Sequence, residues 1–166
     1  LGVQYEDQRV REQAVRWLAD LSDEELKDCL LQLVQVLKVE KNHISPLAVF
    51  LLNRALAAPA VIGHRLYWLL ACDMRDPLTS TRFKLVLEAL LWAYGPERRT
   101  FLKQNQAIRK MQLVSVLLAE KKNAAAKNEK LGSLLEENAF VGHFQCPYDP
   151  SLVVGAIEIG KCRAMD

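Results

Sequence analysis

The stretch CLLQLVQVLKVEK, residues 29–41, is apolar at nearly every position and decides which fold the sequence predicts. Gln32, Gln35 and Lys38 interrupt it at spacings of three residues, which places them on one narrow strip of a helix. A helix that is apolar over most of its circumference has to be covered on several sides. We therefore expect this helix to lie inside a stack of helices.

The helix that contains this stretch begins with a capping signal. Ser22 is followed three residues later by Glu25, which is the pattern of a capping box. Asp23, Glu24 and Glu25 could form a catalytic acid pair, but acidic residues in a first helical turn are better explained by capping and by the helix dipole. The apolar face should consist of Leu26, Leu30, Leu33, Val34 and Leu37, widened by Leu31, Val36 and Val39.

Further helices are predicted on both sides of this one, up to about residue 139. They should begin near residues 8, 45, 59, 76, 97 and 123, and Gly95-Pro96 should end the helix before residue 97. The connections are short, so that neighbouring helices should be antiparallel, and helical hairpins recur about every 35–40 residues. The expected fold is all-α, an α-α superhelix of stacked antiparallel pairs, HEAT- or armadillo-like, with a short extended tail. The predicted core includes Leu30, Leu33, Leu37, Phe50, Leu66, Trp68 and Leu87.

The character of the sequence changes after Phe140. The segment VVGAIEIG, residues 153–160, is β-branched and short, which is typical of a strand, and nothing in the sequence offers it a partner strand. The sequence begins at Leu1 and not at Met, so we expect it to be a piece of a longer chain. The expected division is a helical domain over residues 1–139 and a linker with one strand over residues 140–166.

Residues that could carry chemistry are scattered. Of the three histidines His43, His64 and His143, His64 lies on an apolar helix, where a buried core histidine is favoured over a ligand. The four cysteines, at positions 29, 72, 146 and 162, form no CxxC pair, and buried free thiols are favoured over disulfides. We therefore predict no catalytic, cofactor-binding or metal-binding residue in this chain.

The region between residues 97 and 130 is locally basic. The cationic residues that make it basic include Arg98, Arg99, Lys103, Arg109, Lys110, Lys121 and Lys122. A solvated helix face is the favoured interpretation, and contact with an acidic partner or a lipid headgroup surface is the alternative. Trp17, Trp68 and Trp92 lie on separate helices and are expected to pack in the core.

Four segments resemble the helical (accessory) domain of phosphoinositide 3-kinases and the start of the kinase N-lobe. They are VREQAVRWLADLSDEELKDCLLQLVQVLKVEK, FLLNRALAAPAVIGHRLYWLLACDM and TRFKLVLEALL for the helical domain, and FQCPYDPSLVVGAIEIGKCRAM for the passage into the N-lobe. The last of these segments is similar to class I enzymes, nearest the gamma type, and Ile62-Gly63-His64 also resembles class I more than class III.

This resemblance implies a noncatalytic scaffold segment within a lipid kinase. The whole enzyme would use Mg²⁺ and transfer the ATP phosphate to the 3-hydroxyl of phosphoinositides. This segment would bind neither ATP nor Mg²⁺. The implied partners are the C2, Ras-binding and kinase domains of the same chain and a regulatory subunit. The implied location is the cytoplasm, with recruitment of the whole enzyme to membranes. A free-standing HEAT-like adaptor that binds other proteins stays open as the alternative.

Overall fold

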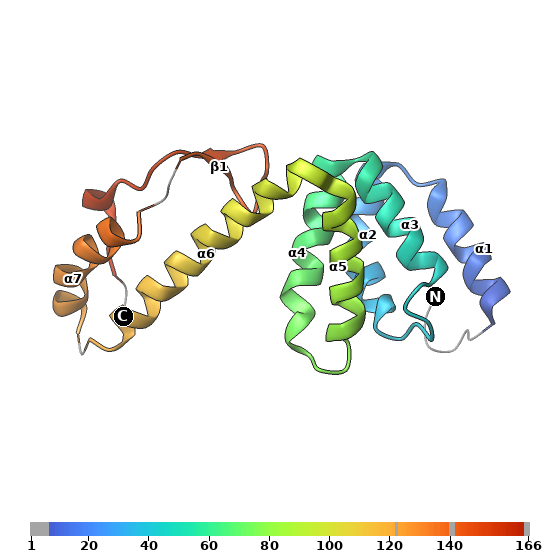
Figure 1. The fold of residues 1–166 in the computed structure, drawn as a ribbon, viewed down its shortest axis with the longest axis horizontal. Helices are drawn as coiled ribbons and strands as arrows, with labels where there is room; N and C mark the ends of the chain where they lie inside the picture. The colour runs from blue at the N-terminus through green and yellow to red at the C-terminus, as the bar shows by residue number, and fades with distance from the viewer. Residues whose placement is uncertain (1–6, 122, 140–141, 165–166) are drawn as a thin grey trace. The chain divides into compact units, whose positions relative to one another are not determined.

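The computed structural model describes residues 7–121, 123–139 and 142–164, and the chain forms two compact units. The first unit is Leu1–Gly95 and the second is Pro96–Asp166. The all-α class with a short extended tail is confirmed (Figure 1).

The first unit is a two-layer stack of helices. Its elements are α1 (Gln8–Ala19), α2 (Asp23–Leu37), α3 (Pro46–Ala57), the π-helix η1 (Pro59–Gly63), α4 (His64–Cys72), the 3₁₀ turn η2 (Asp73–Arg75) and α5 (Ser80–Tyr94). Helix α3 packs against both α1 and α5, while α2 packs against α4. Helices α4 and α5 run side by side in opposite directions, joined by a short loop (Figure 1). This alternation of odd and even helices is the packing expected for an α-α superhelix.

Helix α2 is covered over one broad face and not all round. The predicted capping box between Ser22 and Glu25 is present, and the face that the sequence predicts for it is buried. Leu31, however, is 48% exposed and Val39 is exposed as well, so the expectation that they widen the buried face is wrong. Helix α2 packs mainly against α3, α4 and η1, and Leu31 and Val39 lie outside the buried face.

A hydrogen bond from Tyr94 replaces one that the end of α3 cannot make. The carbonyl of Ala55 would normally accept from the residue four positions on, but that residue is Pro59, which has no N–H. The Tyr94 hydroxyl donates to this carbonyl instead, at 3.0 Å. Gly63 makes room for the hydroxyl, because a Cβ there would lie 1.6 Å from it. The chain thus passes from α3 through the π-turn into α4 with the buried carbonyl satisfied.

The 3₁₀ turn η3 (Gly95–Glu97) spans the point of the sequence where the two units divide. The second unit contains α6 (Arg98–Ala119), α7 (Ala124–Glu137), β1 (Phe144–Gln145), β2 (Val153–Val154) and η4 (Ile159–Lys161). Its core forms where α6 and α7 meet, from Val114, Leu131, Leu134 and Leu135. Strands β1 and β2 pair antiparallel, with Phe144 opposite Val154 and Gln145 opposite Val153. The strand predicted over residues 153–160 is thus two residues long, and the prediction that it has no partner is wrong.

Several smaller predictions are corrected. Trp17 and Trp92 are 67% and 78% exposed, so neither packs in the core of its unit. Phe50 and Trp68 are only half-buried, since each lies at the edge of its helix's buried face. The helix expected near residue 76 begins at Ser80, because the Asp76 carboxylate accepts from the Leu78 N–H and holds a turn first.

Other predictions hold. Leu30, Leu33, Leu37, Leu66 and Leu87 are buried. Gly95 ends α5 with a φ of 54°, a conformation that favours glycine. All four cysteines are free thiols, as predicted, but none of them is buried: Cys29, Cys146 and Cys162 are half-buried and Cys72 is exposed.

Candidate contact site

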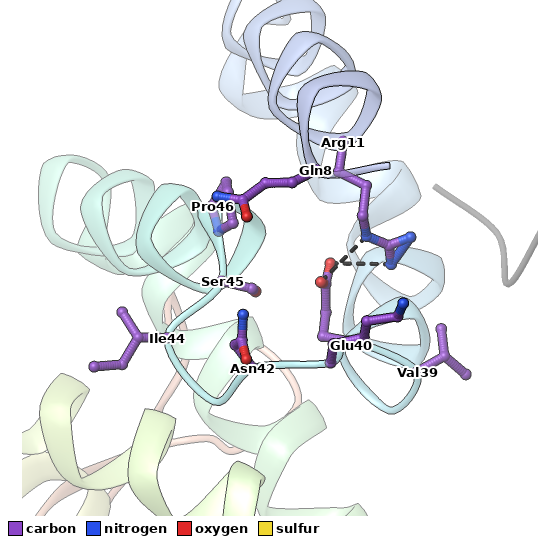
Figure 2. Close-up of a pocket in the computed structure, with 9 residues that line it drawn as sticks. Gln8, Arg11, Val39, Glu40, Asn42, Ile44, Ser45 and Pro46 are labelled. Atoms are coloured by element: carbon purple, nitrogen blue, oxygen red, sulfur yellow. Dashed lines mark hydrogen bonds and ion pairs between the residues drawn. The ribbon is translucent and has the colours of Figure 1, made fainter. Parts of the chain in front are cut away.

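A small polar pocket lies between the start of α1 and the loop that joins α2 to α3 (Figure 2). Its volume is about 130 Å³, and it is lined by Gln8, Arg11, Val39, Glu40, Lys41, Asn42, Ile44, Ser45 and Pro46. Pockets that hold nucleotides or drug-sized ligands are about 300–1,000 Å³. This pocket is therefore too small for a nucleotide and can accept at most a side chain or a few waters.

The centre of the pocket is a buried ion pair. Arg11 Nε donates to Glu40 Oε2 at 3.2 Å, and Nη2 lies 3.2 Å from Oε1, which makes the pair two-pronged (Figure 2). The side chains are only 11% and 5% exposed. Because removing one partner would leave the other charge buried and unpaired, a pair of this kind holds its two segments together. Here it fastens α1 to the loop after α2.

A second arginine fastens the connection between α1 and α2. Arg54 of α3 donates to the carbonyl oxygens of Ala19 and Leu21, at 3.4 and 2.9 Å. It also contacts Asp23 Oδ1, with Nη2 at 2.5 Å. The last carbonyls of a helix and the first residues of the next are thereby satisfied by one planar guanidinium.

A third arginine does the same at the end of α2. Arg82 of α5 donates from Nη1 to the carbonyls of Leu37 and Lys38, at 2.5 and 3.0 Å, and from Nη2 to the carbonyl of Glu40. These carbonyls have no partner within the helix, because α2 has ended. A cation at this position also suits the negative end of the helix dipole.

The polar strip of α2 has a structural partner in η2. Gln35 Nε2 donates to Asp73 Oδ2 at 2.8 Å, and Lys38 Nζ lies 2.9 Å from the same oxygen. The hydrogen bond from Gln35, followed by that from Lys38, lowers the pKa of the Asp73 carboxyl below its ordinary value. Two of the three polar interruptions in residues 29–41 are therefore explained by this contact.

The structure does not bring the other polar candidates together. His64 is buried, as expected, while His43 and His143 are exposed at separate places. Glu25 caps α2 together with Ser22, and two hydrogen bonds from Ser22 lower the pKa of Glu25, while Asp23 lies in the first turn and pairs with Arg54. Within residues 7–121, 123–139 and 142–164, no three His, Cys, Asp or Glu side chains gather as metal ligands would.

Sequence reasoning missed the three fastening arginines. Arg54 stands in a mainly apolar run, FLLNRALAA, and this isolation is a signal that could have found it, whereas Arg11 and Arg82 have polar and charged neighbours and give no such signal. Their acceptors are mainly backbone carbonyls and acids about 30 to 45 residues away, which no local pattern reveals.

The basic region is partly used inside the second unit. Lys103 donates to the carbonyl of His143 and Lys110 to that of Ala139. Arg98, Arg99 and Arg109 are exposed on α6, whereas Lys122 lies outside the described residues. None of the helices in the described ranges is both long enough and apolar enough to cross a bilayer.

Comparison with known proteins assigns this architecture to a family. Residues 1–103 match the model of the phosphoinositide 3-kinase family accessory domain (PIK domain). The chain belongs to the phosphoinositide 3-kinase family. The matched part is thus a helical accessory domain of this family, as its resemblance to that domain implied.

Relatives in the same family match over nearly the whole chain. Phosphatidylinositol 3-kinase 2 of Dictyostelium discoideum is 35% identical over 166 residues, covering 100% of this chain and 9% of that protein. The human phosphatidylinositol 4-phosphate 3-kinase C2 domain-containing subunit beta is 39% identical over 171 residues, covering 98% of this chain and 10% of that protein. The chain therefore spans about a tenth of the length of the curated relatives that it matches. The similarity to the gamma type in particular stays a prediction.

Proposed function

We propose that the chain serves as the internal scaffold of a lipid kinase that transfers the γ-phosphate of ATP to the 3-hydroxyl of a phosphoinositide. The observation that carries the proposal is the accessory-domain match over residues 1–103, where the structure forms a stack of helices. The relatives that extend over the whole chain are named as phosphatidylinositol kinases. ATP and Mg²⁺ belong, in this proposal, to other parts of the longer protein.

The proposed partners are other domains of the same polypeptide: C2, Ras-binding and kinase domains, and in addition a regulatory subunit. Rigidity is what such a scaffold requires, and Arg11, Arg54 and Arg82 provide it by holding the helix connections of the first unit. The proposed location is the cytoplasm, with recruitment of the whole enzyme to membranes. The division into a helical domain over residues 1–139 and a linker after it remains part of the proposal.

The experiment weakens the stack in the longer kinase and asks which kinetic property changes. Gly63→Ala should lower the yield of folded enzyme, while the KM for ATP of the enzyme that does fold stays the same, because a scaffold does not touch the nucleotide. Gly132→Ala, where a Cβ would meet nothing closer than 3.9 Å, is the matched control. Full yield of Gly63→Ala together with a raised KM for ATP would place this segment in the nucleotide site and contradict the proposal.

A free-standing adaptor is the second candidate. Its concave face would bind other proteins without any kinase domain in the same polypeptide. Reading the coding sequence beyond residue 166 separates the two: a kinase lobe that follows directly supports the scaffold, and its absence supports the adaptor.

A further inference from the structure

Two apolar side chains protrude from loops of the first unit. Ile44, in the connection between α2 and α3, is 84% exposed, and Leu78, in the connection between α4 and α5, is 93% exposed. An isolated exposed leucine needs no explanation, but apolar side chains that protrude from neighbouring loops form a surface that association would cover. We call the two connections, residues 38–45 and 73–79, the loop end.

The two connections lie at the same end of the first unit. Gln35 and Lys38, near the end of α2, both contact the Asp73 carboxylate in η2. Arg82, in the first turn of α5, donates to backbone carbonyls where α2 ends. Helix α2 therefore ends beside the loop from which α5 begins, and Figure 1 shows both connections at one edge of the stack of helices.

The carboxylates of the loop end have partners within the protein. Glu40 pairs with Arg11, Asp73 is held by two side chains of α2, and Asp76 accepts from a backbone N–H of its own turn. Lys41 is exposed on the same loop as the protruding isoleucine. The loop end thus presents apolar and cationic side chains together, while its acidic groups serve internal contacts.

The start of α1 adds a second exposed cation. Gln8 and Arg11 line the polar pocket together with Lys41, so the first turn of α1 borders the loop after α2. Arg9 lies in this turn and is exposed. Asp7 precedes it, but its carboxylate accepts from the Arg9 N–H as the cap of α1. Positive charge therefore surrounds the loop that carries the protruding isoleucine.

The geometry of the loop end favours a lipid surface over a folded protein partner. Protein interfaces depend on side chains that fill well-packed pockets. Ile44 and Leu78 stand out from the surface instead, and the pocket beside them is polar. Figure 2 shows the Ile44 side chain turned away from the pair of Arg11 and Glu40. The headgroup layer of a bilayer accepts protruding apolar side chains, and anionic lipids attract neighbouring lysines and arginines.

We propose that the loop end contacts an anionic lipid surface. Ile44 and Leu78 enter the headgroup layer, and Lys41 and Arg9 supply the positive charge that anionic lipids attract. The inference goes beyond the proposed function and does not depend on it, because a scaffold needs no lipid contact of its own.

Sedimentation of the 166-residue chain with vesicles tests the proposal. The chain should bind vesicles of equimolar phosphatidylserine and phosphatidylcholine more tightly than vesicles of phosphatidylcholine alone, and added salt should weaken the binding. Ile44→Asp and Leu78→Asp should each lower the partition coefficient about tenfold or more, since each removes an inserted side chain and adds a negative charge. No binding to the mixed vesicles, or equal binding by the unmodified chain and both variants, would overturn the proposal.

The far end of α5 offers a matched control. Trp92 is exposed and apolar like Leu78, but it lies near the end of α5, whereas the loop end lies at its start. Trp92→Asp should therefore bind the mixed vesicles as the unmodified chain does, and a tenfold loss would contradict the proposal. Leu78→Trp should bind about threefold or more tightly, because tryptophan favours the membrane interface. Misfolding cannot produce such a gain.

Other contacts give different results. If Arg109→Ala, at an exposed position of α6, abolishes vesicle binding and Leu78→Asp does not, the second unit binds the lipid and the proposal fails. If vesicles do not bind, but Ile44→Asp and Leu78→Asp weaken contact with another domain of the longer kinase, the loop end docks protein and the proposal fails equally. Vesicle binding through the loop end, in a longer protein without lipid kinase activity, would support the inference and reject only the proposed function.

Discussion

Gly63 stands at a position where no side chain fits. A Cβ would lie 1.6 Å from the Tyr94 hydroxyl and 2.7 Å from the Ala55 carbonyl oxygen. We expect Gly63→Ala to destabilise the first unit by about 2–4 kcal/mol, since it adds overpacking to the loss of a buried hydrogen bond. Urea unfolding followed by circular dichroism measures the difference. Gly132→Ala, within helix α7, should be neutral or slightly stabilising, and a similar loss in both variants would contradict this explanation.

Two leucines of α2 differ in burial although they are the same residue type, so their substitutions test whether burial determines the loss of stability. Leu33 is buried and Leu31, two positions earlier on the same helix, is exposed. Leu33→Ala should lower the free energy of unfolding by about 2–5 kcal/mol, because it leaves a cavity. Leu31→Ala should cost less than about 1 kcal/mol. Equal urea midpoints for the two variants would mean that the side of α2 that carries Leu31 is covered as well.

At the scale of single residues, the sequence correctly predicted which side chains are buried where the helical spacing of apolar residues is sufficient to identify them. The stripe from Leu26 to Leu37 was predicted because its spacing repeats. Trp17 and Trp92 were wrongly predicted to be buried, because the helical period shows that a face is apolar but not whether a neighbouring helix covers it. The bond from Tyr94 to Ala55 joins residues 39 positions apart, and no local pattern encodes it.

At the scale of elements, Arg82 holds the end of α2. We expect Arg82→Ala to destabilise the first unit by about 2–4 kcal/mol, because three backbone carbonyls lose a charged donor at once. Arg82→Lys should recover only part of this loss, since an ammonium group lacks the planar fork. Lys84→Ala, at an exposed position on α5, serves as the control. If thermal melts show that Lys84→Ala lowers the Tm as much as Arg82→Ala does, the capping role of Arg82 is refuted.

The start of α2 should make stability depend on acidity. Hydrogen bonds from Ser22 lower the pKa of Glu25 in the folded state, so this carboxylate contributes stability above its unfolded pKa. The contribution is lost as the pH falls through the lowered folded pKa, and Asp73, whose pKa is also lowered, acts in the same direction. Glu25→Gln should therefore be less stable than the unmodified chain near pH 7, and the gap should close below about pH 4. If the Tm difference between Glu25→Gln and the unmodified chain stays constant from pH 7 to pH 3, the Glu25 carboxylate does not contribute to stability in this way.

Elements themselves were largely predictable from their ends. Ser22, Ser45-Pro46 and Gly95 mark boundaries that the structure keeps. The π-turn at Pro59–Gly63 and the delayed start of α5 were missed, because both depend on how a turn is satisfied by distant or side-chain partners. The pairing of β2 with β1 was missed since a strand of two residues gives no readable alternation.

At the scale of the whole molecule, the fold class followed from the order and spacing of the helices, whereas the family was implied by the resemblance of four sequence segments. The candidate site did not, because its residues come from separate helices and meet only after folding. The expected boundary at residue 139 stays a prediction beside the compact units that divide at Gly95 and Pro96.

The purified chain should neither hydrolyse ATP nor phosphorylate phosphoinositide vesicles. The pocket between α1 and the loop after α2, at about 130 Å³, is too small for a nucleotide. A radiometric assay with [γ-³²P]ATP checks this, with the longer kinase as the positive control. Turnover that copurifies with the chain through two orthogonal columns would overturn the noncatalytic assignment.

The bond between Tyr94 and Ala55 has a consequence for how the first unit opens. The final turn of a helix usually frays, because its carbonyls lack partners. Here the last residue of α5 is tied to the end of α3, so that this turn cannot unwind without also uncovering a buried carbonyl on another helix. Amide protons near Tyr94 and near Ala58 should consequently exchange with deuterium as one cooperative group.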